Sequence, residues 1–281
     1  MKTTNFGPKP WHQENWDFRA ALNFIFGGTG AGLLVLAAFS GVTGNALRAE
    51  ILLALGLIGA GLVSVWFEIG RPLRALNVGF NPFTSWMTRE SFAAGLVFAL
   101  GLAAVWYASA ALAMAAALAV LVFVYCQGRM LHGAKGIPAW RERSVVWLIV
   151  TTGLAEGAGL FVAISTLFDI PAKSVLGYFS LALIARGLAW STYRIGVAKS
   201  AVRPALAALD RAGKIVIQFG TIAPLALLLL AVFAPDYARV ALLLAGAGAI
   251  AAGWQLKFVL ITRAAYNQGF ALPHLPIRGS R

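Results

Sequence analysis

The sequence has very few of the residues that build redox centres in proteins. It contains one cysteine, Cys126, and three histidines, His12, His132 and His274. A single cysteine cannot form a disulfide within the chain or hold an iron–sulfur cluster, which needs several cysteine ligands. Haem in a helical bundle needs axial ligands inside the helices, whereas two of the histidines lie in the tails and His132 follows an apolar run. We therefore expect no haem, no cluster and no metal site in this chain.

Acidic residues are also scarce, and most of the chain is apolar. There are 10 Asp and Glu against 23 Lys and Arg, and 60% of the residues are hydrophobic. The charges stand in short clusters between long apolar runs, and a helix needs about 20 apolar residues to cross a bilayer core roughly 30 Å thick. A soluble domain could not bury so many such runs. The sequence predicts an all-α, polytopic integral membrane protein.

The apolar runs divide into eight expected transmembrane helices, which we expect to form two four-helix bundles in a single membrane domain, residues 1–281. The expected spans are 20–41, 50–69, 91–108, 110–127, 145–167, 174–195, 214–234 and 239–261. The third and fourth form one apolar stretch that is too long for a single crossing of about 20 residues. We divide it near Tyr107 and Ser109, as a tight helical hairpin. We expect no cleavable signal peptide before the first span, which would then act as an uncleaved signal.

The positive charges are distributed by loop rather than along one tract. Of the 23 Lys and Arg, 18 fall in the two tails, in the loops after the second, fourth and sixth spans, or at the adjoining ends of spans. The opposite loops contain only Arg48, Lys173 and Arg239, and Arg186 and Lys257 lie inside spans. Because cytoplasmic loops carry the excess of Lys and Arg, we expect a bacterial inner-membrane protein with both termini in the cytoplasm. This bias accounts for the net charge, so nucleic acid is not an expected partner.

The first span contains a glycine-rich run, Gly27-Gly28-Thr29-Gly30-Ala31-Gly32. The run looks like a dinucleotide-binding fingerprint, but no strand precedes it and it lies in an apolar span. Gly28 and Gly32 instead have the small-xxx-small spacing that lets helices approach closely, as do Gly153 and Gly157. These residues therefore indicate close packing between membrane helices.

The densest polar cluster follows the second span. It contains Gly70-Arg71-Pro72-Leu73-Arg74-Ala75 and, further on, Ser85-Trp86-Met87-Thr88-Arg89-Glu90. Glu68 and Glu90 are expected at the ends of consecutive spans, on the same membrane face. Partial burial there would raise the pKa of Glu68 and allow proton exchange near neutral pH. The simpler interpretation is an ordinary basic loop with solvated carboxylates.

These two segments, together with Ile137-Pro138-Ala139-Trp140 after the fourth span, carry a family resemblance. The chain resembles the DMSO reductase membrane-anchor family, within the wider superfamily of polysulfide and nitrite reductase (NrfD-like) membrane subunits. The resemblance implies a chain that anchors a molybdopterin subunit and an iron–sulfur subunit. It also implies electron exchange with a quinone, either menaquinone or ubiquinone.

The resemblance implies site residues in the first three spans. Glu90 matches a carboxylate that the family implicates in quinol binding, and Glu68 falls where the DMSO reductase anchor has a histidine. Asn23 resembles a polar position that lines the quinone pocket in the polysulfide reductase branch. We expect Glu68 and Glu90 to carry protons and Asn23 to be a polar partner of the quinone. The other candidates for the pocket are Gly27, Gly28 and Gly30, which would leave room for the ring, and Arg71, Trp86, Arg89 and His132.

Three charges fall well inside the expected spans rather than at their ends. Glu156 lies roughly 17 Å deep at 1.5 Å per residue, and Arg186 lies at a comparable depth. Buried membrane charges are costly and are usually paired or functional. We expect a structural ion pair between Glu156 and Arg186, with a proton path as the alternative. Lys257 is expected to extend its ammonium group to the membrane surface.

Three classes of function remain. The favoured one is the quinone-reactive subunit of an oxidoreductase complex, in which partner subunits carry out the substrate chemistry. A transporter or channel, and a structural anchor without a quinone site, are the alternatives. In the favoured class, a basic cytoplasmic face would dock the iron–sulfur subunit. The residues of this face are Arg71, Arg74, Arg89, Arg129, Lys135, Arg141 and Arg143.

Overall fold

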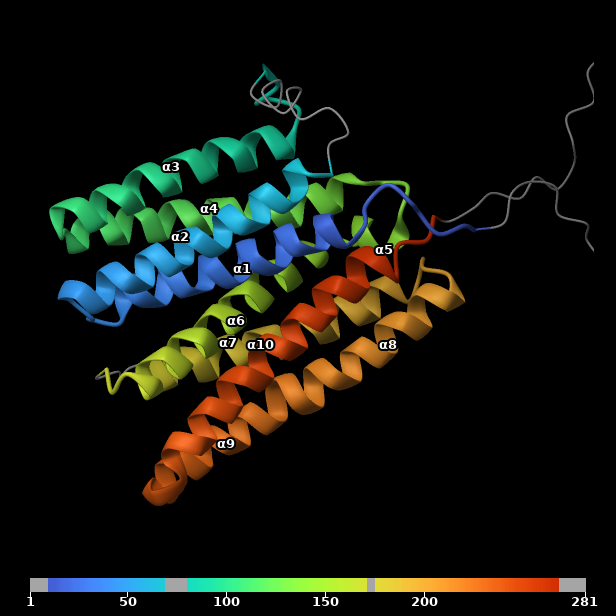
Figure 1. Cartoon of the computed structure of the whole chain (residues 1–281). Coiled ribbons are helices and arrows are strands. Elements are labelled where there is room, and N and C mark those ends of the chain that lie inside the picture. The colour runs from blue at the N-terminus through green and yellow to red at the C-terminus, as the bar shows by residue number, and fades with distance from the viewer. Residues whose placement is uncertain (1–9, 69–79, 171–174, 268–281) are drawn as a thin grey trace, which may run out of the picture.

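The computed structural model describes residues 10–68, 80–170 and 175–267. Within these ranges all the regular elements are helices, and eight helical segments are long and apolar enough to cross a membrane (Figure 1). The segments are α1 (Phe18–Phe39), α2 (Gly44–Trp66), α3 (Trp86–Tyr107), α4 (Ala110–Gly133), α6 (Val145–Leu167), α7 (Val175–Val197), the continuous run Arg203–Phe233, and Pro235–Thr262. The predicted all-α membrane fold with eight spans is confirmed.

The last two segments are composite. The seventh consists of α8 (Arg203–Ile217), a π-helical turn η2 (Gln218–Ile222) and α9 (Ala223–Phe233). The eighth consists of a 3-10 turn η3 (Pro235–Tyr237) and α10 (Ala238–Thr262). A short helix, α5 (Pro138–Arg141), connects α4 to α6.

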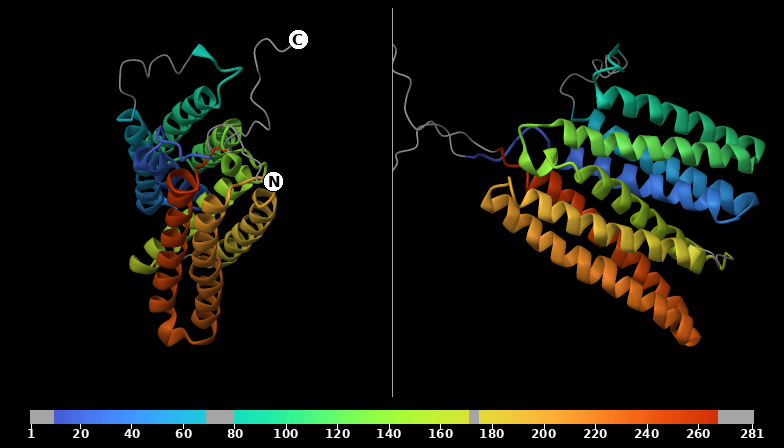
Figure 2. Two further views of the ribbon diagram at one scale, coloured as in Figure 1. Left: turned by 90° about the vertical axis from the view of Figure 1, so that its right-hand side faces the viewer. Right: turned by 180° about the vertical axis from the view of Figure 1, so that it is seen from behind.

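The helices form two groups of four spans. Helices α1 to α4 lie side by side in one half, and α6, α7, α8–α9 and α10 form the other (Figures 1 and 2). The described ends of the chain lie together at one end of the molecule. There the Gln13 N–H donates to the Ala265 carbonyl at 2.9 Å, and the Asn267 N–H donates to the Trp11 carbonyl at 3.0 Å. An even number of crossings brings both termini to the same side.

The hairpin between α3 and α4 is as tight as the sequence predicts. Helix α3 ends at Tyr107, and Ala108 takes the left-handed conformation with φ of 50°. The Ser109 hydroxyl then caps α4 by accepting a hydrogen bond from the Leu112 N–H at 3.3 Å. One left-handed residue and one capping residue therefore suffice to reverse the chain.

Several helices extend beyond the spans expected from hydropathy. Helix α2 begins at Gly44 rather than residue 50, and α8 begins at Arg203 rather than residue 214. Helix α3 begins at Trp86 because the Ser85 hydroxyl accepts a hydrogen bond from the Thr88 N–H at 3.3 Å. Hydropathy follows the apolar part of a helix, whereas capping sets its end. Glu50 and Glu90 consequently lie inside helices rather than at their ends.

The two halves meet where glycines of α1 face glycines of α6. A Cβ atom added at Gly153 would lie 2.9 Å from the Gly28 carbonyl oxygen. A Cβ atom added at Gly157 would collide with the backbone of Gly32 and Leu33. The close packing predicted from the small-xxx-small spacing is therefore present.

We predict that Gly157→Ala destabilises the protein by about 1–3 kcal/mol, the usual cost of forcing extra atoms into a close-packed contact. The matched control is Gly56→Ala on α2, where an added Cβ meets no heavy atom within 4 Å. The control should be neutral or slightly stabilising, since alanine favours helix over glycine by about 0.5–1 kcal/mol. Thermal unfolding in detergent measures both, and equal midpoints for the two variants would contradict the packing argument.

Candidate functional site

A cavity of about 240 Å³ lies at the end of the molecule where the described chain ends meet. It is lined by Asn15, Trp16, Ala20, Asn23, Phe24, Val65, Glu68, Met87, Glu90 and Met130. Three residues singled out from the sequence, Asn23, Glu68 and Glu90, are among them. The rest of the lining is mostly apolar, from α1, α2, α3 and α4. The structure thus brings two carboxyl groups and one amide to a single small cavity.

The inner part of the site is a buried hydrogen-bond chain. Glu90 and Asn23 are 4% and 3% exposed, and the Asn23 Nδ2 donates to Glu90 Oε1 at 3.2 Å. The Gln127 Nε2 on α4 donates to the Asn23 backbone carbonyl at 3.1 Å. Within the described part of the chain, Asn23 Oδ1 and Gln127 Oε1 have no hydrogen-bond partner. The Asn23 oxygen belongs to a residue that lines the cavity and can accept a hydrogen bond from a ligand or a water molecule, whereas Gln127 is not among the lining residues.

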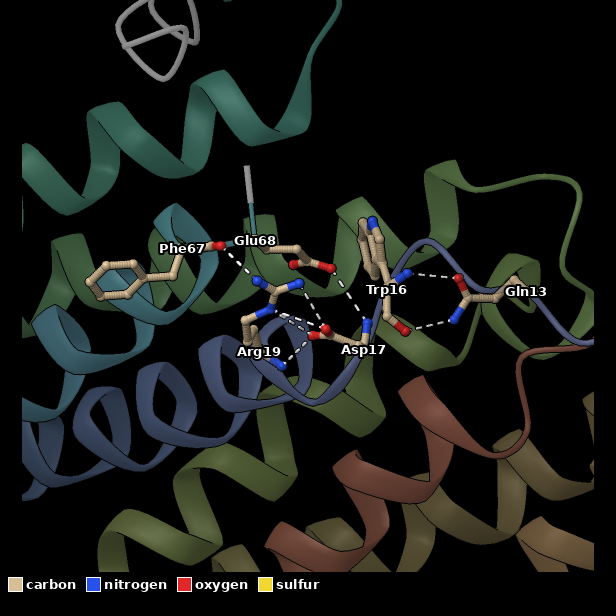
Figure 3. Close-up of polar contacts among 6 residues, drawn as sticks. All are labelled: Gln13, Trp16, Asp17, Arg19, Phe67 and Glu68. Atoms are coloured by element: carbon tan, nitrogen blue, oxygen red, sulfur yellow. Dashed lines mark hydrogen bonds and ion pairs between the residues drawn. The ribbon is translucent and has the colours of Figure 1, made fainter. Parts of the chain in front are cut away.

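Glu68 lies at the more exposed edge of the cavity, where the start of α1 holds the end of α2 (Figure 3). The Asp17 backbone N–H donates to Glu68 Oε1 at 3.4 Å. Arg19 Nη1 donates to the Phe67 carbonyl at 2.7 Å, and the same guanidinium pairs with the Asp17 carboxylate at 2.9 Å. Asp17 also caps α1, because its carboxylate accepts from the Arg19 N–H at 2.7 Å. The position of Glu68 is thus set by the cap of a different helix.

Local electrostatics favour protonation of Glu68. Burial raises the pKa of its carboxyl group above the ordinary value of 4.5, and the hydrogen bond from Asp17 opposes this only in part. The neighbouring Asp17 shows the reverse effect, because the hydrogen bond from Arg19 lowers the pKa of its carboxyl group. Glu68 is therefore the one of these two acids that holds a proton more readily.

Trp16 fixes one wall of the cavity. The Gln13 side chain bonds to both ends of the Trp16 backbone, donating to its carbonyl and accepting from its N–H, each at 2.8 Å (Figure 3). The indole ring lies 5.0 Å from the Trp140 ring, measured between centroids. Trp140 in turn donates from Nε1 to the Leu260 carbonyl at 2.9 Å. Through Trp140, the Ile-Pro-Ala-Trp segment therefore helps to hold Trp16, and with it this wall of the cavity, in place.

Trp86 and Arg89 lie beside the cavity rather than among the described residues that line it. The Arg89 guanidinium carbon is 4.2 Å from the centroid of the Trp86 ring, and that of Arg129 is 4.4 Å away. Both cations therefore contact the indole by cation–π interactions. Arg89 also donates to the Pro82 and Phe83 carbonyls, at 2.7 and 2.6 Å. These contacts order the segment before α3 and so fix the start of the helix that carries Glu90.

The other candidates from the sequence are located elsewhere. A Cβ atom at Gly27 would lie 2.5 Å from Gln127 Nε2, one at Gly28 would collide with the Lys257 ammonium, and one at Gly30 would lie 2.6 Å from the Ala54 carbonyl oxygen. Neighbouring helices thus occupy the room that these glycines were expected to leave for a ligand ring. His132 lines a different, basic cavity with Lys135, Arg141 and Arg143, and Arg71 and Arg74 lie outside the described residues.

The sequence matches the family model for the DMSO reductase anchor subunit (DmsC) over residues 16–264. The chain belongs to this family. The match covers most of the chain and confirms the resemblance drawn from the two loops and the eight-span layout. A comparison with curated proteins found no match. Membership of the anchor family implies association with catalytic and electron-transfer subunits.

A second polar cluster lies in the middle of this anchor subunit, between its two halves. Lys257 Nζ on α10 binds Glu156 Oε2 on α6 at 2.7 Å, and both residues are fully buried. The Thr29 hydroxyl on α1 lies 2.8 Å from the same Glu156 oxygen, and Trp254 Nε1 donates to that hydroxyl at 2.9 Å. The cluster therefore joins one helix of the first half to two of the second.

Two expectations about these buried charges are wrong. Lys257 does not extend to the membrane surface, because its ammonium group is held by Glu156 inside the bundle. Glu156 consequently pairs with Lys257 rather than with Arg186. Hydropathy gives the depth of each charge but not the direction in which it points around its helix, and that direction decides the partner.

Arg186 has a different role, beside the π-helical turn η2 of the seventh span. In an α-helix the Gly220 carbonyl would accept from the N–H four residues ahead, but that residue is Pro224, which has none. The Arg186 Nη2 donates to the Gly220 carbonyl, and its Nη1 donates to the Ala249 carbonyl at 2.8 Å. The buried guanidinium thus gives the Gly220 carbonyl, which cannot bond to residue 224, a hydrogen-bond partner inside the bundle.

We predict that Lys257→Met destabilises the anchor subunit by about 3–5 kcal/mol, because it leaves Glu156 buried without its counter-charge. The double variant Glu156→Gln with Lys257→Met should recover most of that loss, since no charge then remains in the pair. Unfolding in detergent gives the free energies for a double-mutant cycle. Additive effects of the two substitutions would contradict direct pairing.

Proposed function

We propose that this chain is the quinone-reactive membrane subunit of a molybdopterin oxidoreductase, exchanging electrons between an iron–sulfur subunit and the membrane quinone pool. The observation that supports it most is the single cavity that holds Glu68, Glu90 and Asn23. Ligand sites are typically apolar clefts with a few convergent polar groups, about 300–1,000 Å³ in volume. At about 240 Å³ the cavity is smaller than this range, which fits a site that takes only the head of a quinone and leaves the apolar tail outside in the lipid.

The residues of the cavity match the chemistry that a quinone needs. A quinone supplies the two-electron chemistry when bound, and each of its two oxygens gains or loses a proton. Asn23 Oδ1 is free to accept a hydrogen bond from a hydroxyl, and Glu90 lies 3.2 Å from the same amide. In this proposal Glu90 transfers a proton to or from the ligand, and the less buried Glu68 exchanges protons with water. The apolar walls orient the ring and exclude bulk solvent.

The cavity lies at the end of the molecule where we expect the iron–sulfur subunit to dock. It lies at the end of the molecule that carries the described termini and also Arg89, Arg129, Lys135, Arg141 and Arg143. Lys and Arg mark the cytoplasmic side of bacterial membrane proteins, so this end faces the cytoplasm. A cluster-bearing subunit docked on these cations would be close to the quinone head. The molybdopterin subunit binds beyond it.

We predict that Glu90→Gln or Glu68→Gln slows quinone turnover by about 10²-fold or more, the size expected for loss of a positioned proton-transfer group. Assembly of the complex and activity with a soluble dye should persist, because the dye bypasses the cavity. Because burial raises the pKa of Glu68, turnover that uses its proton should fall as the pH rises through that pKa. The Glu68→Gln variant should lack this fall.

The matched control for these two variants is Glu14→Gln, which neutralises an exposed carboxylate near the same end of the molecule. It should keep the quinone kinetics of the unsubstituted protein. Normal quinone turnover in both cavity variants would exclude the two carboxylates from the mechanism and favour a purely structural anchor.

We also predict that reversing Arg71 and Arg141 together, to glutamate, releases the iron–sulfur subunit from membranes. The reason is electrostatic, since charge complementarity steers and orients such interfaces. Immunodetection of the subunit in membrane and soluble fractions measures the release. The matched control reverses Arg48 and Arg239, which lie at the opposite end of the bundle. Full assembly of the first variant would place the docking face elsewhere.

A further inference from the structure

A second cavity, of about 430 Å³, lies at the opposite end of the bundle from the candidate quinone site. It is formed between the start of α2 and the end of α6. Its lining residues are Ala46, Ala49, Glu50, Leu53, Ile164, Phe168 and Ile170. Glu50 is the one polar side chain among these described lining residues. The cavity is therefore apolar except for one carboxyl group.

The Glu50 carboxyl group lacks a partner in the described chain. Glu50 is 1% exposed, and neither of its oxygens has a hydrogen-bond partner among the described residues. An isolated buried carboxylate is strongly unfavourable unless it is paired and hydrogen-bonded. Glu68 and Glu90 are each hydrogen-bonded within the chain, and Glu156 has two partners. Among the buried glutamates of the described residues, Glu50 is thus the one whose carboxyl group has no partner there.

The cavity opens toward lipid. Two of its lining residues, Leu53 and Phe168, are 43% and 72% exposed, and in a membrane protein such apolar exposure faces acyl chains. A neighbouring cavity of about 420 Å³ shares Ile170 and contains an ion pair of 3.3 Å between Arg239 and Asp169. The Glu50 carboxyl group and the Arg239 guanidinium therefore line two adjacent cavities, which share Ile170.

We propose that the Glu50 cavity binds a phospholipid with a primary ammonium headgroup, of the phosphatidylethanolamine class. The ammonium group carries three N–H donors and a positive charge, so it can bond to both Glu50 oxygens at once. Arg239, which lines the adjacent cavity and pairs with Asp169, would supply a cation for the phosphate of the same headgroup. The acyl chains would lie on the exposed faces of Leu53 and Phe168. A quinol fits less well, because its second hydroxyl group would face an apolar wall.

Native mass spectrometry of the purified full chain tests this proposal. The protein is delipidated and then given equal amounts of phosphatidylethanolamine and phosphatidylcholine with the same acyl chains. The two lipids share a phosphate and a positive charge, but only the first has N–H donors. The first bound lipid should be phosphatidylethanolamine by on the order of tenfold, as expected for a charge-assisted hydrogen bond.

Two variants and one control assign the preference to the cavity. Glu50→Gln keeps the shape but removes the charge, and the lipid ratio should fall to about one. Ala46→Leu keeps the carboxyl group but fills the cavity, so it should lower the lipid ratio by the same amount. This second variant tests the site even if Glu50→Gln does not fold. The control Asp236→Asn neutralises an exposed acid at the same end and should keep the ratio of the unsubstituted chain.

A ratio near one in the unsubstituted protein would overturn the proposal, and would mean that Glu50 is protonated or paired within the chain. A preference that survives both cavity variants would also overturn it, because the lipid would then bind elsewhere. Quinone turnover does not enter the measurement. The lipid site and the proposed quinone function can therefore fail independently.

Discussion

The close approach of α1 to α6 is the contact on which the placement of the polar groups depends. Glycines at this contact allow the two backbones to meet, and an added methyl group at Gly157 would collide with Gly32. Helix α1 carries Asn23 toward the candidate quinone site and Thr29 toward the central charge pair. A change in the depth or rotation of α1 would therefore disturb both clusters together.

Much of this arrangement could be predicted from the sequence, because it follows from one-dimensional patterns. Apolar length gave the eight spans, loop charge gave the common side of the termini, and the Tyr107–Ser109 break gave the hairpin. Glu68, Glu90 and Asn23 share a cavity because the ends of consecutive spans meet on one side. What the sequence could not supply is rotation about each helix axis, which decides that Gly27 faces Gln127 and that Glu156 faces Lys257.

Some residues of the site gave only weak signals in the sequence. Gln127 near the end of the fourth span is a polar residue in an apolar run, and such a residue usually has a buried partner. The expected span 50–69 puts Glu50 at its first residue, but α2 begins at Gly44, more than one turn before it. Its burial became evident only when the helix start was known. Helix caps, rather than hydropathy, would have been the better guide there.

The energetics of the central pair argue against the transporter alternative. A path for ions through the middle of the bundle would have to separate Lys257 from Glu156, which are buried and 2.7 Å apart. Leaving either charge unpaired costs about 3–5 kcal/mol, and Thr29 and Trp254 add further bonds that must break. The carboxyl groups at the two ends are different, since Glu68 is partly exposed and Glu50 has no described partner. The carboxyl groups without a buried counter-charge thus lie toward the two ends of the bundle, whereas the central charge pair is held in place.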